Sequence, residues 1–133
     1  MKETIAKKWV KALRSGKYKQ GKDLLKKITK KQEQHCCLGV LCDLYNKEQK
    51  LKNKPPIKQK IERDISNRYD LVRFGTTAEL LPTTVRRWAG VKTSDGMILF
   101  KDYIHRDSLS SLNDRGVTFK KIANLIEKHF KYL

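Results

Sequence analysis

Apolar side chains recur at helical spacing near both ends of the chain. Ile5, Trp9 and Leu13 fall on one face of an N-terminal segment whose other face carries lysines, a pattern typical of an amphipathic helix. Near the other end, the apolar positions of residues 119–130 form one arc that follows Thr118, a residue suited to cap a helix. The pattern therefore predicts an amphipathic helix at each end.

The segment 34–45 is the longest weakly charged run of the chain. Placed on a helix, its apolar side chains cover about 240° of the circumference and leave a narrow strip that contains Gly39 and Asp43. A helix that is apolar on most of its sides is buried, because other elements must pack against those sides. We therefore predict a core helix here.

A polar and basic segment follows this helix. Residues 47–60 contain Pro55-Pro56, which excludes a continuous helix, and we interpret the segment as an exposed connection. A chain of 133 residues fits one domain of ordinary size. We therefore expect residues 1–133 to form a single domain with this connection on its surface.

The second half of the chain predicts strands and short helices. Residues 68–74 favour a strand, and residues 80–90 favour a short helix with a proline in its first turn and a closing glycine. The Asp95-Gly96 pair between two apolar runs predicts a β-hairpin. The predicted fold class is α+β, with helices dominating and a small antiparallel sheet from residue 68 to residue 104.

The charge of the chain changes the functional picture. Lysine and arginine number 31 against 14 acidic residues, a net charge of +17, which attracts anions such as nucleic acid, nucleotides, phosphorylated ligands and anionic lipid. No signal peptide and no apolar run long enough to span a bilayer are present, so we expect a cytoplasmic protein without a membrane partner. Three clustered cysteines, an odd number, predict reduced thiols.

The three cysteines are candidates for metal ligands and for a nucleophile. On a helix Cys36, Cys37 and Cys42 point apart by about 100–140°, so no metal site is predicted. Buried thiols acting as small hydrophobic side chains are the simplest interpretation. The alternative is a hydrolase nucleophile, Cys36 or Cys37, activated at the helix N-terminus with His105 as the base.

The loop after the first helix combines cations, an aromatic ring and an amide between Gly16 and Gly21. Arginine binds phosphate through two hydrogen bonds, tyrosine stacks on a base, and a flexible basic loop wraps an anion. The spacing of a P-loop is absent. The residues predicted to bind a ligand here are Arg14, Lys17, Tyr18, Lys19, Gln20 and Lys22.

Three residues outside this loop extend the predicted binding site. Asp43 is interpreted as the partner of a neighbouring basic side chain or backbone amide, and the alternative is a ligand-facing carboxylate beside Gly39. Arg86 and Arg87 form a second, weaker group of cations next to Trp88, a residue that we place in the core.

Four motifs are distributed along the chain, namely Trp9-x-x-Ala12-Leu13-Arg14-Ser15-Gly16-x-Tyr18-x-Gln20, Cys36-Cys37-Leu38-Gly39-Val40-Leu41-Cys42-Asp43, Leu81-Pro82-x-x-Val85-x-x-Trp88-Ala89-Gly90 and Leu112-Asn113-Asp114-x-Gly116-x-Thr118-Phe119-x-x-Ile122-Ala123. Together they resemble the motifs of a family of small proteins encoded by tailed phages and prophages. The resemblance implies an accessory phage protein of the bacterial cytosol, where small proteins often interfere with host defence. We predict no cofactor.

Four functional hypotheses follow, and the leading one is not enzymatic. It is an accessory phage protein that binds a phosphate-bearing ligand, such as a nucleotide signal of host defence, and sequesters it. The second is sequence-tolerant binding of nucleic acid through cationic helix faces. The third is a cysteine hydrolase, and the fourth is an inhibitor that binds an acidic host defence protein. The sequence leaves the oligomeric state open.

Overall fold

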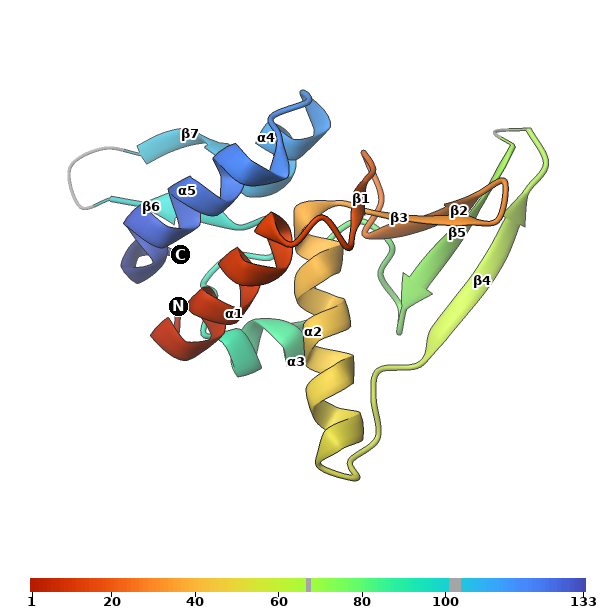
Figure 1. Cartoon of the computed structure of the whole chain (residues 1–133), viewed down its shortest axis with the longest axis horizontal. Coiled ribbons are helices and arrows are strands. Elements are labelled where there is room, and N and C mark those ends of the chain that lie inside the picture. The colour runs from red at the N-terminus through yellow and green to blue at the C-terminus, as the bar shows by residue number, and fades with distance from the viewer. Residues whose placement is uncertain (67, 101–103) are drawn as a thin grey trace.

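Helices and strands alternate along the chain (Figure 1). The computed structural model describes residues 1–66, 68–100 and 104–133, and of residues 104–106 it describes the backbone alone. These residues form a small single α+β domain, as predicted. The elements are α1 (Glu3–Arg14), β1 (Lys19–Gln20), β2 (Lys26–Thr29), β3 (Gln32–His35), α2 (Cys37–Leu51), β4 (Gln59–Asp64), β5 (Tyr69–Phe74), α3 (Thr83–Ala89), β6 (Met97–Leu99), β7 (Ile104–Ser108), α4 (Leu109–Asp114), α5 (Phe119–His129) and the short 3-10 helix η1 (Phe130–Tyr132).

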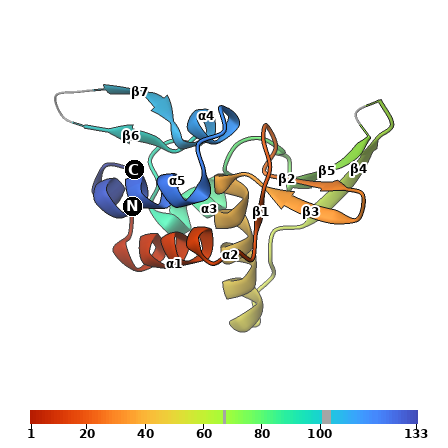
Figure 2. The same cartoon turned by 45° about the horizontal axis from the view of Figure 1, so that its top comes forward.

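Helix α2 is the core of the molecule. Its N-terminal half is fully buried, with Leu38, Val40 and Leu41 at 0% exposure, and Figures 1 and 2 place it between the α1 and α5 layer on one side and the larger sheet on the other. Trp9 of α1 is equally buried, and its indole Nε1 donates a hydrogen bond to the carbonyl oxygen of Cys37 at 2.9 Å. The predicted core helix and its amphipathic neighbours are confirmed.

The larger sheet has five strands in the order β1-β3-β2-β5-β4, with β1 and β3 parallel and the other neighbours antiparallel. The prediction of a sheet confined to residues 68–104 is therefore wrong, because this sheet begins at Lys19. Its β2–β3 hairpin turns at Lys30 and Lys31, which both have positive φ angles. In Figures 1 and 2 this hairpin and the β4–β5 hairpin project side by side away from the helices.

The second sheet pairs β6 with β7 and corrects one predicted turn. Met97 lies opposite Ser108 and Leu99 opposite Ile104, so the chain reverses after β6 and Asp95-Gly96 precedes the hairpin. The carbonyl oxygens of Asp95 and Gly96 instead accept hydrogen bonds from the first turn of α4, at 3.2 and 3.0 Å. The pair connects two elements and does not close a hairpin.

The exposed connection predicted for residues 47–60 is shorter than expected. Helix α2 continues to Leu51 and β4 begins at Gln59, so the exposed connection is limited to residues 52–58. Buried Asn46 fixes it to α2, because its side chain accepts a hydrogen bond from the Ile57 amide at 2.8 Å and donates one to the Ile57 carbonyl oxygen at 3.2 Å.

None of the described helices has the length and apolar composition needed to cross a bilayer.

Candidate functional site

The loop after α1 is fixed at both ends. Helix α1 ends at Arg14 with Ser15 as its C-cap, and Gly16 has a φ of +72°, a left-handed conformation that glycine adopts without strain. The chain then enters β1, and the amide of Gly21 donates a hydrogen bond to the carbonyl oxygen of His35 at 2.8 Å. The predicted ligand loop is therefore anchored to α1 and to β3, which positions Lys17 and Tyr18 between them.

Tyr18, Asp43 and Lys47 form a hydrogen-bonded cluster over α2. The Tyr18 hydroxyl donates to the Asp43 carboxylate, and the Lys47 ammonium donates to the Tyr18 oxygen at 2.9 Å and pairs with Asp43 at 2.8 Å. These bonds raise the pKa of Lys47 well above its usual value. Burial raises the pKa of Asp43, but the hydrogen bonds from Lys47 and Tyr18 outweigh it and the net pKa is lowered. Asp43 thus bonds a basic side chain, as the simpler interpretation predicted.

His35 lies behind this cluster with 4% of its surface exposed. Its ring meets the edge of the Tyr18 ring at a centroid distance of 5.2 Å, and neither ring nitrogen has a hydrogen-bond partner within the described residues. Burial lowers the pKa of His35, and the charge of Lys26 lowers it further. Asp43 and Glu33 act in the opposite direction, and Lys47 lowers the pKa slightly. The ring is therefore neutral at pH 7.

Buried His35 predicts a loss of stability in mild acid. The unfolded chain binds a proton on this residue below about pH 6.5, whereas the folded protein resists it. The free energy of unfolding should be undiminished above that pH and should fall as the pH drops below it. Urea unfolding of the wild type and of His35→Leu at pH 7.5, 6.5 and 5.5 measures this loss. The free energy of unfolding of the variant should depend less on pH. Equal slopes for the two proteins would contradict the assignment to His35.

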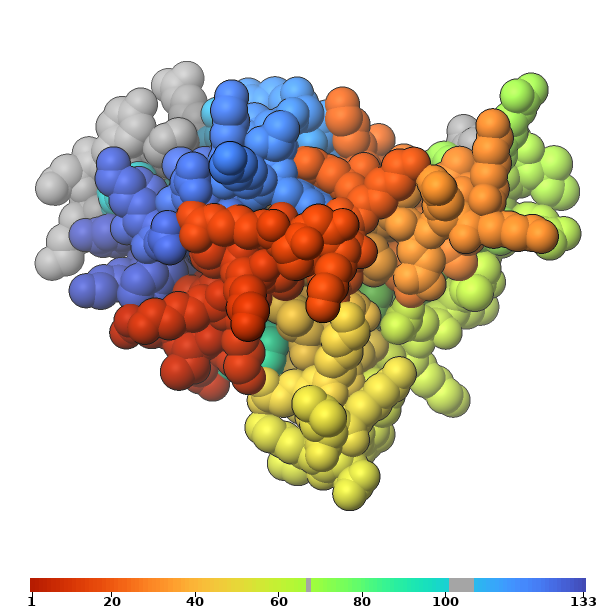
Figure 3. All heavy atoms as spheres, in the orientation of Figure 1, coloured from red at the N-terminus to blue at the C-terminus, as the bar shows by residue number. Residues whose placement is uncertain are grey.

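Three adjoining hollows surround Lys17. The first, about 270 Å³, is lined by Tyr18, His35 and Asp43 together with Lys17, Lys19, Glu33 and Lys47. The second, about 300 Å³, lies between α1 and α2, and we call it the four-lysine hollow because Lys8, Lys11, Lys17 and Lys47 line it. Its other lining residues are Ala12, Ser15, Tyr18 and Leu44, so no carboxylate contributes to its wall. Figure 3 shows α1 in red above the yellow C-terminal half of α2 on this face.

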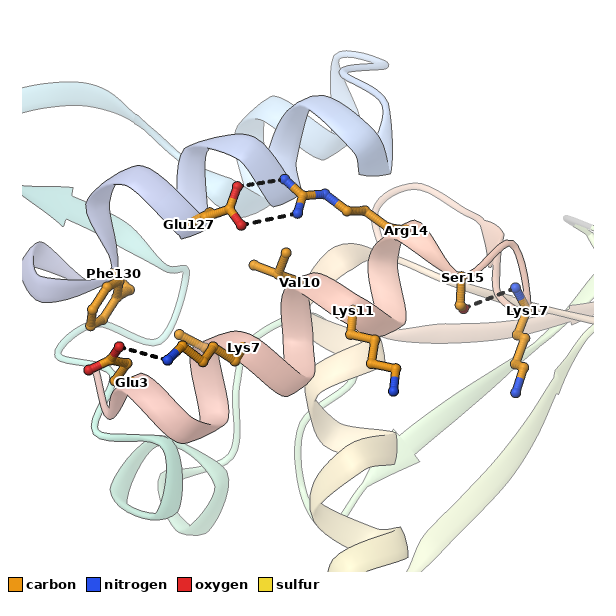
Figure 4. Close-up of a pocket in the computed structure, with 10 residues that line it drawn as sticks. Glu3, Lys7, Val10, Lys11, Arg14, Ser15, Lys17, Glu127 and Phe130 are labelled. Carbon is orange, nitrogen blue, oxygen red and sulfur yellow. Dashed lines mark hydrogen bonds and ion pairs between the residues drawn. The ribbon is translucent and has the colours of Figure 1, made fainter.

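The third and largest hollow is a groove between α1 and α5 with a volume of about 680 Å³ (Figure 4). Ala6, Val10 and Phe130 supply its apolar lining. In Figure 4 the side chains of Lys11 and Lys17 extend away from the Arg14 and Glu127 pair. Because Lys11, Ser15 and Lys17 also line the four-lysine hollow, the two spaces adjoin at the end of α1.

Arg14 and Gln20, both predicted to bind a ligand, are engaged within the protein. The Arg14 guanidinium donates to both carboxylate oxygens of Glu127, at 2.8 and 3.2 Å, and to Asn124 at 2.7 Å. The Gln20 amide donates to the Val117 carbonyl oxygen at 2.7 Å and to Asn113 at 3.0 Å, and it accepts from the Phe119 amide at 3.0 Å. Both side chains attach the loop to the C-terminal helices.

The other predicted cations are dispersed. Lys19 lines the first hollow and donates a hydrogen bond to Gln32 at 2.6 Å, while Lys22 lies near Gly116. Arg86 donates to the carbonyl oxygen of Lys92. Arg86 and the exposed Arg87 belong to α3, and neither lines any of the three hollows. The structure therefore brings together Lys17, Tyr18, Lys19 and Asp43, and it does not bring the α3 arginines to them.

The three cysteines are buried free thiols. Burial raises the pKa of Cys36 to about 12 and that of Cys37 and Cys42 well above the usual value, so all three are neutral at pH 7. The Cys36 sulfur accepts from the Gly39 amide at 3.4 Å, and the Cys37 thiol donates to the Leu109 carbonyl oxygen at 3.4 Å. No group of three metal-binding side chains occurs among the described residues.

The structure does not favour a cysteine nucleophile or the approach of a ligand beside Gly39. A thiolate nucleophile needs a lowered pKa and access to substrate, and Cys36 and Cys37 have neither. The side chain of His105, the proposed base, lies outside the part of the chain that the structure describes. Gly39 is buried against the backbone of Leu25, so it serves packing between α2 and the segment before β2 rather than the approach of a ligand.

Four residues of the site were missed by the sequence analysis. Lys8 and Lys11 were counted only among the lysines on the polar face of the N-terminal helix, and Lys47 was assigned to the exposed connection. The spacing of Lys8 and Lys11 and the Asp43-to-Lys47 interval of four residues nevertheless place them on defined helix faces. His35 carried no signal of its own, because its burial depends on pairing between β2 and β3.

These features define the class of protein as a small, strongly basic α+β domain with a lysine-lined surface hollow. The chain belongs to the family described as Domain of unknown function (DUF8296), whose model matches residues 1–130. No curated protein and no solved structure matches the chain. The family name carries no activity, so the function is inferred from the site.

Proposed function

We propose that this protein binds a phosphate-bearing ligand, without catalysis, in the four-lysine hollow. The observation that carries the proposal is that four lysines from α1, α2 and the intervening loop line one hollow without a carboxylate in its wall. Cations that converge on a partly enclosed site focus a positive potential, and the net charge of +17 adds to it. An anion the size of a phosphate group is the ligand that such a wall favours.

The four lysines have different roles in this proposal. Lys47 is held by Asp43 and Tyr18, and Lys8 is held by Glu48 at 3.0 Å, so both side chains are fixed in position and their charges are largely offset by these carboxylates. No acidic side chain of the described residues pairs with Lys11 or Lys17. These two ammonium groups are free to move onto a phosphate. Ser15 also lines this wall, but its hydroxyl donates to the Ala12 carbonyl oxygen at 2.6 Å.

The adjoining groove gives the rest of the ligand a place to bind. Ala6, Val10 and Phe130 offer apolar and aromatic contacts, and the groove volume of about 680 Å³ lies within the range of small-molecule sites. A nucleotide combines these two chemistries, because its phosphates are anionic and its base is flat and largely apolar on its faces. We therefore infer that the phosphates occupy the four-lysine hollow and the base occupies the groove.

The motif resemblance suggests the biological setting of this binding. If the protein acts as an accessory phage protein in the bacterial cytosol, the ligand is a nucleotide signal of host defence and binding removes it from circulation. Capture without turnover suits a site whose thiols are buried and neutral. The same chemistry also fits a phosphate group carried by a larger host molecule.

Isothermal titration against a panel of linear and cyclic nucleotides tests the proposal, with Lys11→Gln/Lys17→Gln as the diagnostic variant. Each charge-assisted hydrogen bond contributes about 1.5 kcal/mol or more, so affinity should fall by about 100-fold. The exposed pair Lys50→Gln/Lys54→Gln removes the same charge outside the hollow and should leave affinity nearly unchanged. Absence of heat with every nucleotide, or an equal loss in both variants, would contradict the proposal.

A further inference from the structure

The tips of the β2–β3 and β4–β5 hairpins form a second cationic surface, distinct from the three hollows around Lys17. In Figures 1 and 3 both tips project from the body of the protein on the side away from α1. A shallow hollow of about 480 Å³ joins them. We define the hairpin-tip surface by five of the residues that line this hollow, namely Lys30, Lys31, Arg63, Ile65 and Arg68.

The cations of this surface are exposed and largely uncommitted. Arg63 is 82% exposed and approaches Asp70 only at 4.0 Å, the outer limit of an ion pair. Lys30, Lys31 and Arg68 are also exposed, and none of them has an acidic partner among the described residues. Asp64 and Asp70 are the two carboxylates in the same hollow, so the four cations leave a net positive charge.

Three of the cationic residues at these tips have strained backbone conformations. Lys30, Lys31 and Arg68 have φ angles of +47°, +65° and +59°, a region that costs an L-residue about 1 kcal/mol or more. Asparagine and glycine fill such turn positions without that cost. Cationic side chains at three strained turn positions indicate a function for the charges, because the turns alone would be more stable with other residues.

An apolar side chain stands among these charges. Ile65 is 87% exposed in the β4–β5 turn, between Arg63 and Arg68. A protruding hairpin that carries one apolar residue flanked by arginines has the layout of a groove-binding arm, in which cations contact phosphates and the apolar residue contacts bases. A membrane surface fits less well, because burying one isoleucine contributes only about 2 kcal/mol.

We propose that the hairpin-tip surface binds double-stranded nucleic acid. Lys30 and Lys31 contact the phosphates of one strand, and Arg63 and Arg68 contact those of the other across the groove. Ile65 enters the groove and packs against base edges, which places the apolar contact between the cations of the two hairpin tips. This surface is separate from the four-lysine hollow, so duplex binding and nucleotide binding are independent properties of the chain.

Fluorescence anisotropy with a labelled 20-base-pair duplex, measured from 50 to 300 mM salt, tests this proposal. The variant Lys30→Gln/Lys31→Gln/Arg63→Gln/Arg68→Gln should bind far more weakly, and its slope of log affinity against log salt should be shallower by about 3.6, or 0.9 for each lost phosphate contact. The control Lys50→Gln/Lys54→Gln/Lys120→Gln/Lys121→Gln has the same net charge and should keep most of the slope.

The variant Ile65→Ser tests the apolar contact separately. It should lower duplex affinity by about 10-fold with an unchanged salt slope, because it removes no charge. Absence of duplex binding at 50 mM salt, an equal loss in the tip and control variants, or binding to anionic vesicles without binding to the duplex would overturn the proposal. Lys11→Gln/Lys17→Gln should retain duplex affinity, which keeps this result distinguishable from failure of the nucleotide site.

Discussion

Replacing Gly39 with alanine is expected to lower the free energy of unfolding by about 3 kcal/mol or more. A Cβ atom at this position would overlap the carbonyl oxygen of Leu25 and lie 2.6 Å from its carbonyl carbon. The Leu25 backbone is held on both sides, because its amide donates to Ala78 at 2.7 Å and its oxygen accepts from Cys36 at 3.2 Å. The helix must therefore move away, and the gain of about 1 kcal/mol in helix propensity does not compensate.

Chemical unfolding in urea measures this loss, and Gly16→Ala is the control. Gly16 also adopts a backbone conformation that disfavours alanine, with φ of +72°, but no atom lies within 4 Å of its added Cβ. Its cost should be limited to about 1 kcal/mol of backbone strain. If the two variants lost the same free energy, the close contact between α2 and Leu25 would not be the reason for glycine at position 39.

The Gly39 contact also matters for the candidate site. It brings the N-terminal half of α2 against the segment before β2, while the next two turns of α2 carry Asp43 and Lys47. These two residues bond Tyr18 from the loop after α1. A shift of α2 would therefore separate residues that line the four-lysine hollow, so the packing of one glycine and the geometry of the ligand wall are connected.

The helices followed from the sequence because their stabilisation is local. The period of apolar residues, together with Thr118 as a cap and Gly90 with φ of +71° as a terminator, located α1, α2, α3 and α5. In these elements most apolar side chains face the same core, with Leu51 at the end of α2 an exposed exception, so periodicity and burial agree. Strand β5 was found for the same reason, since Val72 and Phe74 are buried on one face.

Strands β2, β3 and β4 gave no such signal. Their sequences, KKIT, QEQH and QKIERD, contain at most one aliphatic residue each and are dominated by lysine, glutamine and acidic residues. Ile61 of β4 is 59% exposed, so the apolar position of this strand is not a buried one and periodicity does not reveal the strand. What holds these strands is pairing with β5 and with one another, which periodicity along a single segment does not reveal.

Some residues of the candidate site stand out within their own segment, whereas the role of others depends on distant parts of the chain. Tyr18 and Asp43 were both predicted, because an aromatic in a basic loop and a lone carboxylate on an apolar helix stand out within their own segments. Arg14 and Gln20 were expected to face a ligand, yet their partners, Glu127 and Val117, lie about a hundred residues further along the chain. Long-range partners of this kind decide whether a polar side chain remains available.

Replacing Asn113 with alanine is expected to destabilise the fold by about 3 kcal/mol. This residue is 0% exposed, its side-chain oxygen accepts from the Cys37 amide at 3.1 Å and from Gln20 at 3.0 Å, and its amide nitrogen donates to the Gly21 carbonyl oxygen at 2.8 Å. It therefore joins α4, the start of α2 and the end of β1. The variant leaves a buried N–H and a carbonyl without partners, and each unsatisfied group costs about 1–3 kcal/mol.

Thermal and urea unfolding measure the loss, and Asn124→Ala is the matched control. Asn124 also accepts a hydrogen bond, from Arg14 at 2.7 Å, but its bond is exposed, so water replaces it and the cost should stay below about 1 kcal/mol. Because Gln20 and Gly21 lie two and three residues after Tyr18, Asn113→Ala should also weaken nucleotide binding at temperatures where the variant is still folded. Comparable stabilities for the two variants would refute the role assigned to Asn113, since a buried junction and an exposed contact cannot be equally costly to remove.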